Sequence, residues 1–200
     1  MRPPRSLAPF ALLLAMAVAA PAAAQGDPSA AQSFIQERTE SVRAVLRRPA
    51  NDARAAALTE QLGGLLDYEE LGRRALRDHW DVLQPAQREE FVSILRQLVE
   101  RSYQQNLEST LEFRIDVEGA EARGSAVVVR TVARSTRNRR LEPVAIDYQV
   151  KPNGDEWRVF DIVTDGVSLV RNYRAQFNRI LDREGWDGLM GRMRQRLAEG

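Results

Sequence analysis

The pattern of apolar and polar positions divides the chain into a helical first half, an alternating middle and a helical end. In the first half, apolar residues recur every three or four positions, as on the buried face of a helix. Asp27-Pro28 is a good helix start, because a capping side chain precedes proline at the first helical position. Asn51 or Asp52 can cap the next helix. The pattern predicts helices over residues 28–48, 52–66, 67–80 and 84–107.

Between residues 113 and 163 the apolar period changes to two, which is typical of half-buried strands. Phe113, Ile115 and Val117 alternate with charged residues in the first of these stretches. Pro152-Asn153-Gly154 reads as a turn, since proline presets one dihedral angle and Asn-Gly tolerates positive φ. The pattern therefore predicts an antiparallel meander with strands at 113–118, 126–134, 144–151 and 157–163.

The helical period returns at about residue 167 and continues to Gly185, which is expected to end the helix. A final amphipathic helix is predicted over residues 189–197. The order of helices, then strands, then helices is typical of the α+β class. We expect N-terminal helices, a four-stranded antiparallel meander sheet and C-terminal amphipathic helices.

The stretch from residue 157 to 163 is apolar on both of its predicted faces. Strict alternation places Trp157, Val159 and Val163 on one face, and Phe160 and Ile162 on the other. A strand of this kind is covered on both sides. It can be an ordinary central strand in a two-sided core, or one wall of a cavity for an apolar ligand.

The first 24 residues have the pattern of a secretory signal peptide. Arg2 and Arg5 precede an apolar run that is too short for a transmembrane span, and small residues follow at 22–24. We expect cleavage there, leaving residues 25–200 as one soluble domain beyond the membrane across which it is secreted. Loss of the two arginines changes the formal net charge from +1 to −1. Such a charge does not indicate a nucleic-acid-binding protein.

Few residues in the chain offer catalytic chemistry. There is no cysteine, and His79 is the only histidine. Ser168 follows Gly166-Val167, but Val170 stands where a nucleophile elbow requires glycine. A hydrolase that uses Ser168 with His79 is the enzymatic alternative, whereas a capping role for Ser168 is simpler. Asp161 is read as a strand charge with an arginine partner. We therefore expect a protein that is not an enzyme and has no metal or cofactor.

Two groups of arginines are open to more than one interpretation. The segment from Arg134 to Arg140 is a basic hairpin tip, which can be a solvated loop or a contact for anionic headgroups or an acidic partner. Arg171 and Arg174 begin the long helix. They can be ordinary surface charges, or they can lie at the rim of a pocket.

Two long segments, residues 75–107 and 157–190, resemble the MlaC family of periplasmic phospholipid-binding proteins, also called toluene-tolerance proteins. The most specific match is the pattern aromatic-Asp-x-x-x-x-Gly-Val-Ser-Leu at residues 160–169, followed by Asn-Tyr-Arg at 172–174. The resemblance extends over about residues 62–197. Residues 28–60 match only in their general helical character.

The resemblance implies a monomeric carrier whose apolar cavity, between the sheet and the helices, holds phospholipid acyl chains. Its implied partners are an outer-membrane lipoprotein–porin complex and an inner-membrane assembly of MCE-domain protein, permease and ATPase. A carrier of hopanoids or other apolar lipids, or a ligand-free docking module of an ABC transporter, remains open as an alternative.

Helical and strand phase, together with position in the family, predict which side chains face the lipid. Arg171 and Arg174 are expected at the rim, near the headgroup. The predicted pocket residues are Leu71, Ala75, Phe91, Leu95, Leu98, Val99, Tyr103, Tyr148, Trp157, Phe160, Ile162, Val167, Leu169, Val170, Tyr173, Phe177 and Leu181.

Overall fold

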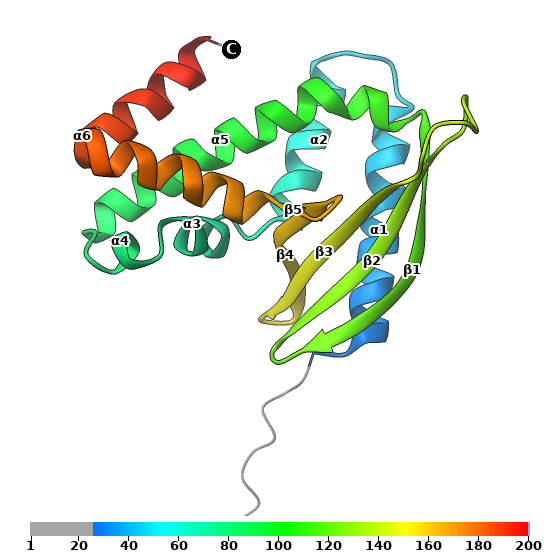
Figure 1. Ribbon diagram of the computed structural model, residues 1–200. Helices are drawn as coiled ribbons and strands as arrows, with labels where there is room; N and C mark the ends of the chain where they lie inside the picture. Colours follow the sequence, from blue (N-terminus) through cyan, green and yellow to red (C-terminus); the bar gives the residue numbers. More distant parts are fainter. Residues whose placement is uncertain (1–25, 200) are drawn as a thin grey trace, which may run out of the picture.

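The computed structural model describes residues 26–199, apart from the side chains of 105–110, so the predicted signal peptide lies outside the described residues. Helices precede a sheet, and a long helix follows it, which confirms the α+β class (Figure 1). The helices are α1 (Pro28–Leu46), α2 (Asp52–Leu65), α3 (Tyr68–Leu76), α4 (Asp78–Asp81), α5 (Pro85–Thr110) and α6 (Leu169–Glu199). The strands are β1 (Phe113–Arg123), β2 (Ala126–Ser135), β3 (Val144–Asn153), β4 (Glu156–Thr164) and β5 (Val167–Ser168).

The first three helices begin at capping side chains, and the sequence predicts the first two of them. Asp27 accepts a hydrogen bond from the amide of Ser29, with Pro28 in the first turn of α1. Asn51, rather than Asp52, caps α2, and Asp67 caps α3. Each cap satisfies an amide that has no partner inside its helix, so these boundaries are fixed by local chemistry.

The strands form one antiparallel sheet in the order β1-β2-β3-β4-β5, which confirms the predicted meander. The structure adds β5, a two-residue strand that pairs with the end of β4. The turn after β3 is tighter than predicted, because Pro152 and Asn153 still pair with Trp157 and Glu156. Gly154, with φ of +61°, makes the turn itself.

The helices cover one face of the sheet. Helix α1 contacts β1 and β2, whereas α2 and α3 contact β4. In Figure 1, α1 and α2 lie behind the strands, and the face toward the viewer carries no helix within the described residues. None of the helices between residues 26 and 199 has the length and hydrophobicity that a transmembrane span requires.

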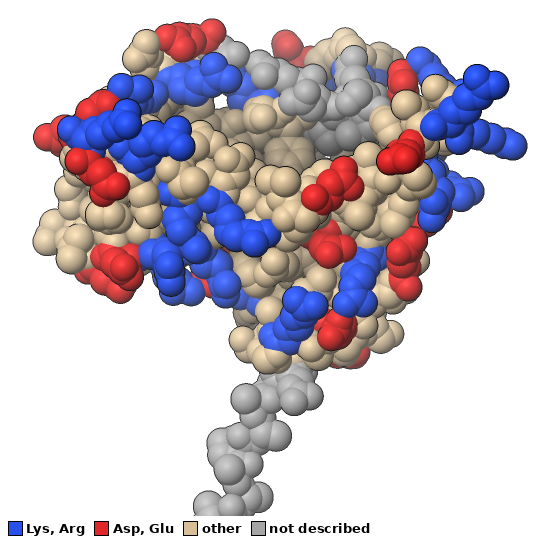
Figure 2. Space-filling view, viewed as in Figure 1, with Lys and Arg blue, Asp and Glu red and all other residues tan. Residues whose placement is uncertain are grey.

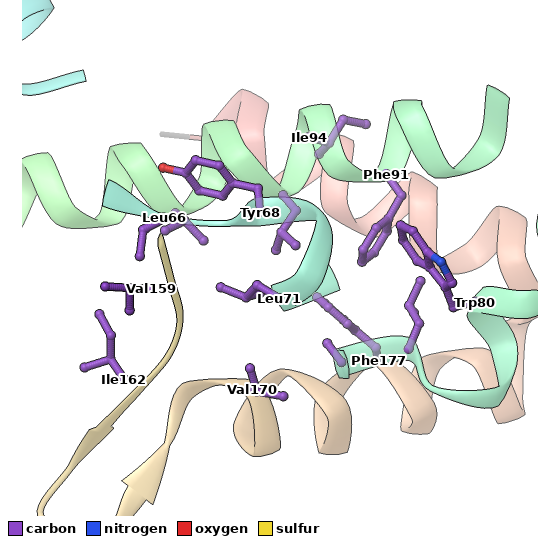
Figure 3. Packing of buried hydrophobic residues seen from close by; sticks show 14 of the residues in the cluster. Leu66, Tyr68, Leu71, Trp80, Phe91, Ile94, Val159, Ile162, Val170 and Phe177 are labelled. Atoms are coloured by element: carbon purple, nitrogen blue, oxygen red, sulfur yellow. The ribbon is translucent and has the colours of Figure 1, made fainter. Parts of the chain in front are cut away.

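Buried apolar side chains form two separate clusters. The larger one joins α1, α3, α5 and α6 to the sheet and includes Phe91 and Leu71 (Figure 3). The smaller one holds α1 against α2 and consists of Val45, Leu46, Leu58 and Leu62. The first two helices therefore share a small core of their own, while Ala31 and Ile35 anchor α1 in the larger cluster as well.

Gly185 divides α6 into two segments, which confirms the predicted stop. Its backbone (φ +66°, ψ −166°) is not helical and lies in a region that favours glycine. The segment beyond it turns back and buries Leu189, Met190 and Met193 in the larger cluster (Figure 1).

A β-bulge changes the faces of β4. The pairing with β3 shifts between Gln149 and Val150, so Phe160 is an extra residue without a partner. Val159 and Ile162 consequently both join the larger cluster on the helix side of the sheet, whereas Phe160 lies on the helix-free side. The expectation of strict alternation, with Phe160 and Ile162 on one face, is wrong at this position.

Candidate functional site

An apolar cavity of about 230 Å³ lies between the helices and the sheet. It borders both the larger and the smaller cluster, and its wall is predominantly hydrophobic. It reaches the surface near the exposed Thr164. The lining residues are Ile35, Arg38, Thr39, Val42, Arg43, Leu62, Leu65, Tyr103, Ile115, Ile146, Tyr148, Ile162 and Thr164.

Regular secondary structure brings these side chains together. On α1, Ile35, Thr39 and Val42 recur every three or four residues and so share the face toward the sheet. On the sheet, Tyr148 lies directly opposite Ile162 in the β3–β4 ladder, and Ile146 lies opposite Thr164. Opposed residues project to the same side, so the pairs make a continuous wall.

Two tyrosines give the cavity its only phenol groups among the described lining residues. Burial raises the pKa of Tyr148 to about 12. Burial also raises the pKa of Tyr103, and the nearby Tyr148 and Tyr173 raise it further. Both rings keep some accessible surface, because that surface borders the cavity. Among the described residues neither hydroxyl has a hydrogen-bond partner, so both are available to a ligand.

The cationic part of the lining comes from α1. Arg43 donates a hydrogen bond to the carbonyl oxygen of Phe113, at the start of β1. The Arg38 guanidinium lies 5.5 Å from the centre of the Phe34 ring. Neither arginine forms an ion pair with a described carboxylate, so the anionic part of an amphipathic ligand can meet positive charge here.

Three of the predicted pocket residues, Tyr103, Tyr148 and Ile162, line the cavity. Most of the others fill the larger cluster instead. Phe91 packs at 5.5 Å from Phe177, measured between ring centroids, and Tyr173 stacks on Phe177 at 5.4 Å. Figure 3 shows Phe91 and Phe177 within this cluster. The predicted residues that are buried in this cluster or packed against it are Leu71, Ala75, Phe91, Leu95, Leu98, Val99, Trp157, Leu169, Val170, Tyr173, Phe177 and Leu181.

The remaining predicted residues lie away from the cavity. Val167 is 64% exposed at the β4–β5 turn. Phe160, Arg171 and Arg174 line a recess on the opposite side of the sheet from the cavity, the first because of the bulge and the other two because α6 begins beside it. The structure therefore does not bring the two predicted rim arginines to the mouth of the apolar cavity.

Sequence reasoning missed the contribution of α1 to the cavity. The helical period places Ile35 and Val42 on one apolar face of the predicted helix over residues 28–48, but the period alone does not assign that face to a ligand. Ile115 and Ile146 follow from strand alternation in the same way. The signal was present as periodicity. Which apolar faces meet a void rather than one another depends on tertiary packing.

The hydroxyl of Ser168 has a structural role. It accepts a hydrogen bond from the amide of Arg171 at 3.1 Å and donates one to Asp161 at 2.6 Å, as expected for the cap of α6. His79 belongs to α4 and shares no hydrogen bond with Ser168. Within residues 26–199 no three His, Asp or Glu side chains are grouped in a way that could hold a metal ion.

Comparison with known proteins gives consistent results. A sequence model described as MlaC protein matches residues 35–195. The intermembrane phospholipid transport system binding protein MlaC of Haemophilus influenzae is 23% identical over 175 residues, which are 86% of this chain and 76% of that protein. A phospholipid-binding protein of Ralstonia solanacearum, solved in complex with a phospholipid, has a TM-score of 0.73 at 24% identity. That match covers 84% of this chain and 97% of the other, and establishes a common fold.

Proposed function

The chain belongs to the MlaC family, and we propose that it is a periplasmic lipid carrier whose apolar cavity holds phospholipid acyl chains. The observation that carries this proposal is the cavity of about 230 Å³ between sheet and helices. The names of the two relatives support phospholipid as the ligand. Passage of lipid between an outer-membrane lipoprotein–porin complex and an inner-membrane MCE-domain, permease and ATPase assembly is part of the same proposal.

The energetics of lipid transfer favour a carrier of this kind. Each methylene moved from water into an apolar site is worth about 0.8 kcal/mol, so two long chains in water cost on the order of 20 kcal/mol. If the cavity wall is as apolar as a bilayer, the free energy of transferring a lipid from the membrane to the protein is close to zero. No covalent bond changes in that transfer, and the protein needs no catalytic group for it.

The lining also suits the polar part of a phospholipid. The free hydroxyls of Tyr103 and Tyr148 can donate to ester carbonyl oxygens of the glycerol backbone. Arg38 and Arg43 can meet the phosphate. In this proposal α1 supplies the headgroup contacts that the sequence assigned to Arg171 and Arg174.

The cavity must widen to hold a whole phospholipid. Its volume of about 230 Å³ is below the roughly 300–1,000 Å³ of typical ligand pockets. The smaller cluster binds α1 to α2 independently of the larger cluster. Ala31 and Ile35 of α1 also belong to the larger cluster, so a movement of the two helices away from the sheet replaces their contacts with the sheet by contacts with acyl chains. We propose this movement as the route of lipid entry.

Native mass spectrometry of protein purified without detergent tests the proposal. We expect a bound mass that lipid extraction identifies as phospholipid. A hopanoid in the extract would change the identity of the proposed ligand but would still support a lipid carrier. A protein that is empty after purification and takes up no lipid from phospholipid vesicles would contradict the proposal.

A matched pair of variants links the lipid to the cavity. Ile146→Asp places a carboxylate in the wall, where desolvation of the charge opposes acyl-chain binding. Ile180→Asp makes the same change at another half-buried isoleucine, which packs on the larger cluster away from the cavity. We expect Ile146→Asp to lose most of its lipid and Ile180→Asp to retain it, compared at equal folded fraction by circular dichroism. Equal retention in both variants would exclude this cavity as the binding site.

A further inference from the structure

A second recess, of about 480 Å³, opens on the opposite side of the sheet from the apolar cavity. It lies where β4, the start of α6 and α3 meet. Figure 2 shows basic side chains gathered over α3 and the start of α6, beside the strands. We call it the arginine recess. Its lining residues are Arg74, Arg123, Val128, Asp147, Gln149, Phe160, Asp161, Val163, Gly166, Ser168, Val170, Arg171 and Arg174.

The floor of the arginine recess is apolar. Phe160 is 2% exposed and Val128 is 7% exposed, although no helix covers this side of the sheet within the described residues. The cover comes from arginine, because the guanidinium of Arg74 lies 4.1 Å from the centre of the Phe160 ring. The β4 bulge thus provides a hydrophobic surface under a layer of positive charge.

Backbone carbonyl groups hold the other arginines in place. Arg174 donates two hydrogen bonds to the carbonyl oxygen of Arg74, at 2.7 and 3.1 Å. Arg171 donates to the carbonyl oxygen of Gly166 at 2.9 Å. Neither side chain forms an ion pair with a carboxylate among the described residues. Both guanidinium groups are therefore ordered and keep unused donors.

Positive charge is in excess at this site. Burial lowers the pKa of Arg174, repulsion from Arg77, Arg74 and Arg171 lowers it further, and only Asp161 opposes this effect. The carboxylate of Asp161 is itself occupied by Ser168 and the amide of Val170. An anion that enters the arginine recess would reduce the repulsion between the guanidinium groups. Because these groups are already held in place, binding costs little conformational entropy.

We propose that the arginine recess binds an acidic peptide segment of a partner protein. Guanidinium groups form paired hydrogen bonds with carboxylates. The half-buried Val163 in the lining can contact an apolar side chain next to the acid. Asp147 and Gln149 offer acceptors to the amide groups of a peptide backbone. A flat bilayer surface cannot follow a recess with a buried floor, whereas a peptide segment can enter it. The site is separate from the lipid cavity and does not depend on bound lipid.

The test measures fluorescence anisotropy of a labelled peptide of alternating glutamate and leucine at low ionic strength. Arg123 and Arg171 are exposed, and the side-chain contacts that they lose are local, with Glu121 and with the carbonyl group of Gly166. The double variant Arg123→Ala/Arg171→Ala is therefore expected to fold. Arg139→Ala/Arg140→Ala removes the same charge from the β2–β3 hairpin tip and serves as the control. We expect about tenfold weaker binding in the recess variant, as two lost ion pairs imply, and an unchanged affinity in the control.

Several results would overturn this proposal. The first is that the wild-type protein does not bind the peptide, and the second is that both double variants lose the same share of peptide affinity. The third is that binding to anionic phosphatidylglycerol vesicles depends on Arg123 and Arg171 while peptide binding does not. Lipid retention, measured on the same samples by native mass spectrometry, is expected to be unchanged in both variants. Because lipid retention is measured separately, a loss of peptide binding with lipid still bound bears only on the arginine recess. A loss of lipid bears on the proposed carrier function.

Discussion

Asp161 organises the turn between β4 and α6. Its Oδ2 atom accepts from the Ser168 hydroxyl at 2.6 Å, and its Oδ1 atom accepts from the Val170 amide at 3.0 Å. The capping role of Ser168 could be predicted because it depends on neighbours in the sequence. The expected arginine partner of Asp161 is not found as an ion pair, because the side chain is 6% exposed and turned toward the helix start. Which groups a buried carboxylate contacts therefore depends on the tertiary structure.

Glu70 makes the stability of the protein depend on pH. It accepts hydrogen bonds from Arg73 and Arg74 and lies 3.3 Å from the Lys151 ammonium group. Burial alone would raise its pKa, but the two arginines and Lys151 outweigh burial and lower the pKa to about 2. The folded state therefore binds the proton less readily than the unfolded chain. The resulting stabilisation is present above pH 5 and is lost as the pH falls toward 2.

We expect the substitution Glu70→Gln to remove part of this acid sensitivity. At pH 7 the variant should be less stable by about 2 kcal/mol, a value reduced from the full shift because both arginine partners are partly exposed. The difference from wild type should shrink as the pH approaches 3. Urea unfolding at a series of pH values measures it. A constant difference across that series would contradict the lowered pKa.

At the scale of elements, helices were easier to predict than the faces of strands. Helix starts depend on local caps such as Asn51 and Asp67, and strand order followed from short connections. The face of Phe160 could not be predicted, because the bulge is defined by pairing with β3 and is stabilised by Arg74 from a distant helix. The same limit applies to α1. Periodicity identifies its apolar face but does not show that this face borders the cavity.

The position of α1 leads to a test by steric filling. Thr39 lines the cavity and its neighbour Glu40 is exposed on the same helix. We expect Thr39→Trp to occupy the space that an acyl chain needs and to lower the amount of bound lipid to a small fraction. Glu40→Trp adds the same side chain on the outside and should leave lipid binding intact. Quantitative lipid extraction compares the two, and equal lipid content would show that α1 does not border the ligand.

At the scale of the whole molecule, the sheet separates two environments. The helix side contains the apolar cavity with Tyr103 and Tyr148, and the other side contains the arginine recess. The sequence predicted the α+β fold and an apolar interior wall. It assigned residues of both sides to one pocket, because periodicity identifies apolar faces but does not show which of them meet closed packing, a void or solvent.

Bound lipid should stabilise the whole molecule. A ligand that binds only the folded state at 100 times its Kd adds about 2.7 kcal/mol, which corresponds to a rise in Tm of roughly 5–10 °C at this chain length. We therefore expect a lower Tm after delipidation, measured by differential scanning calorimetry. Thr39→Trp serves as the comparison, since its Tm should change little on the same treatment. An identical drop in both proteins would assign the effect to the extraction procedure.

The break at Gly185 determines the outline of the protein in solution. An unbroken helix of 31 residues would extend about 46 Å at 1.5 Å per residue, and its far end would carry Leu189, Met190 and Met193 into water. An exposed apolar segment of this kind would promote aggregation. One residue without a side chain thus keeps the hydrodynamic radius small and the surface of the molecule free of this apolar segment.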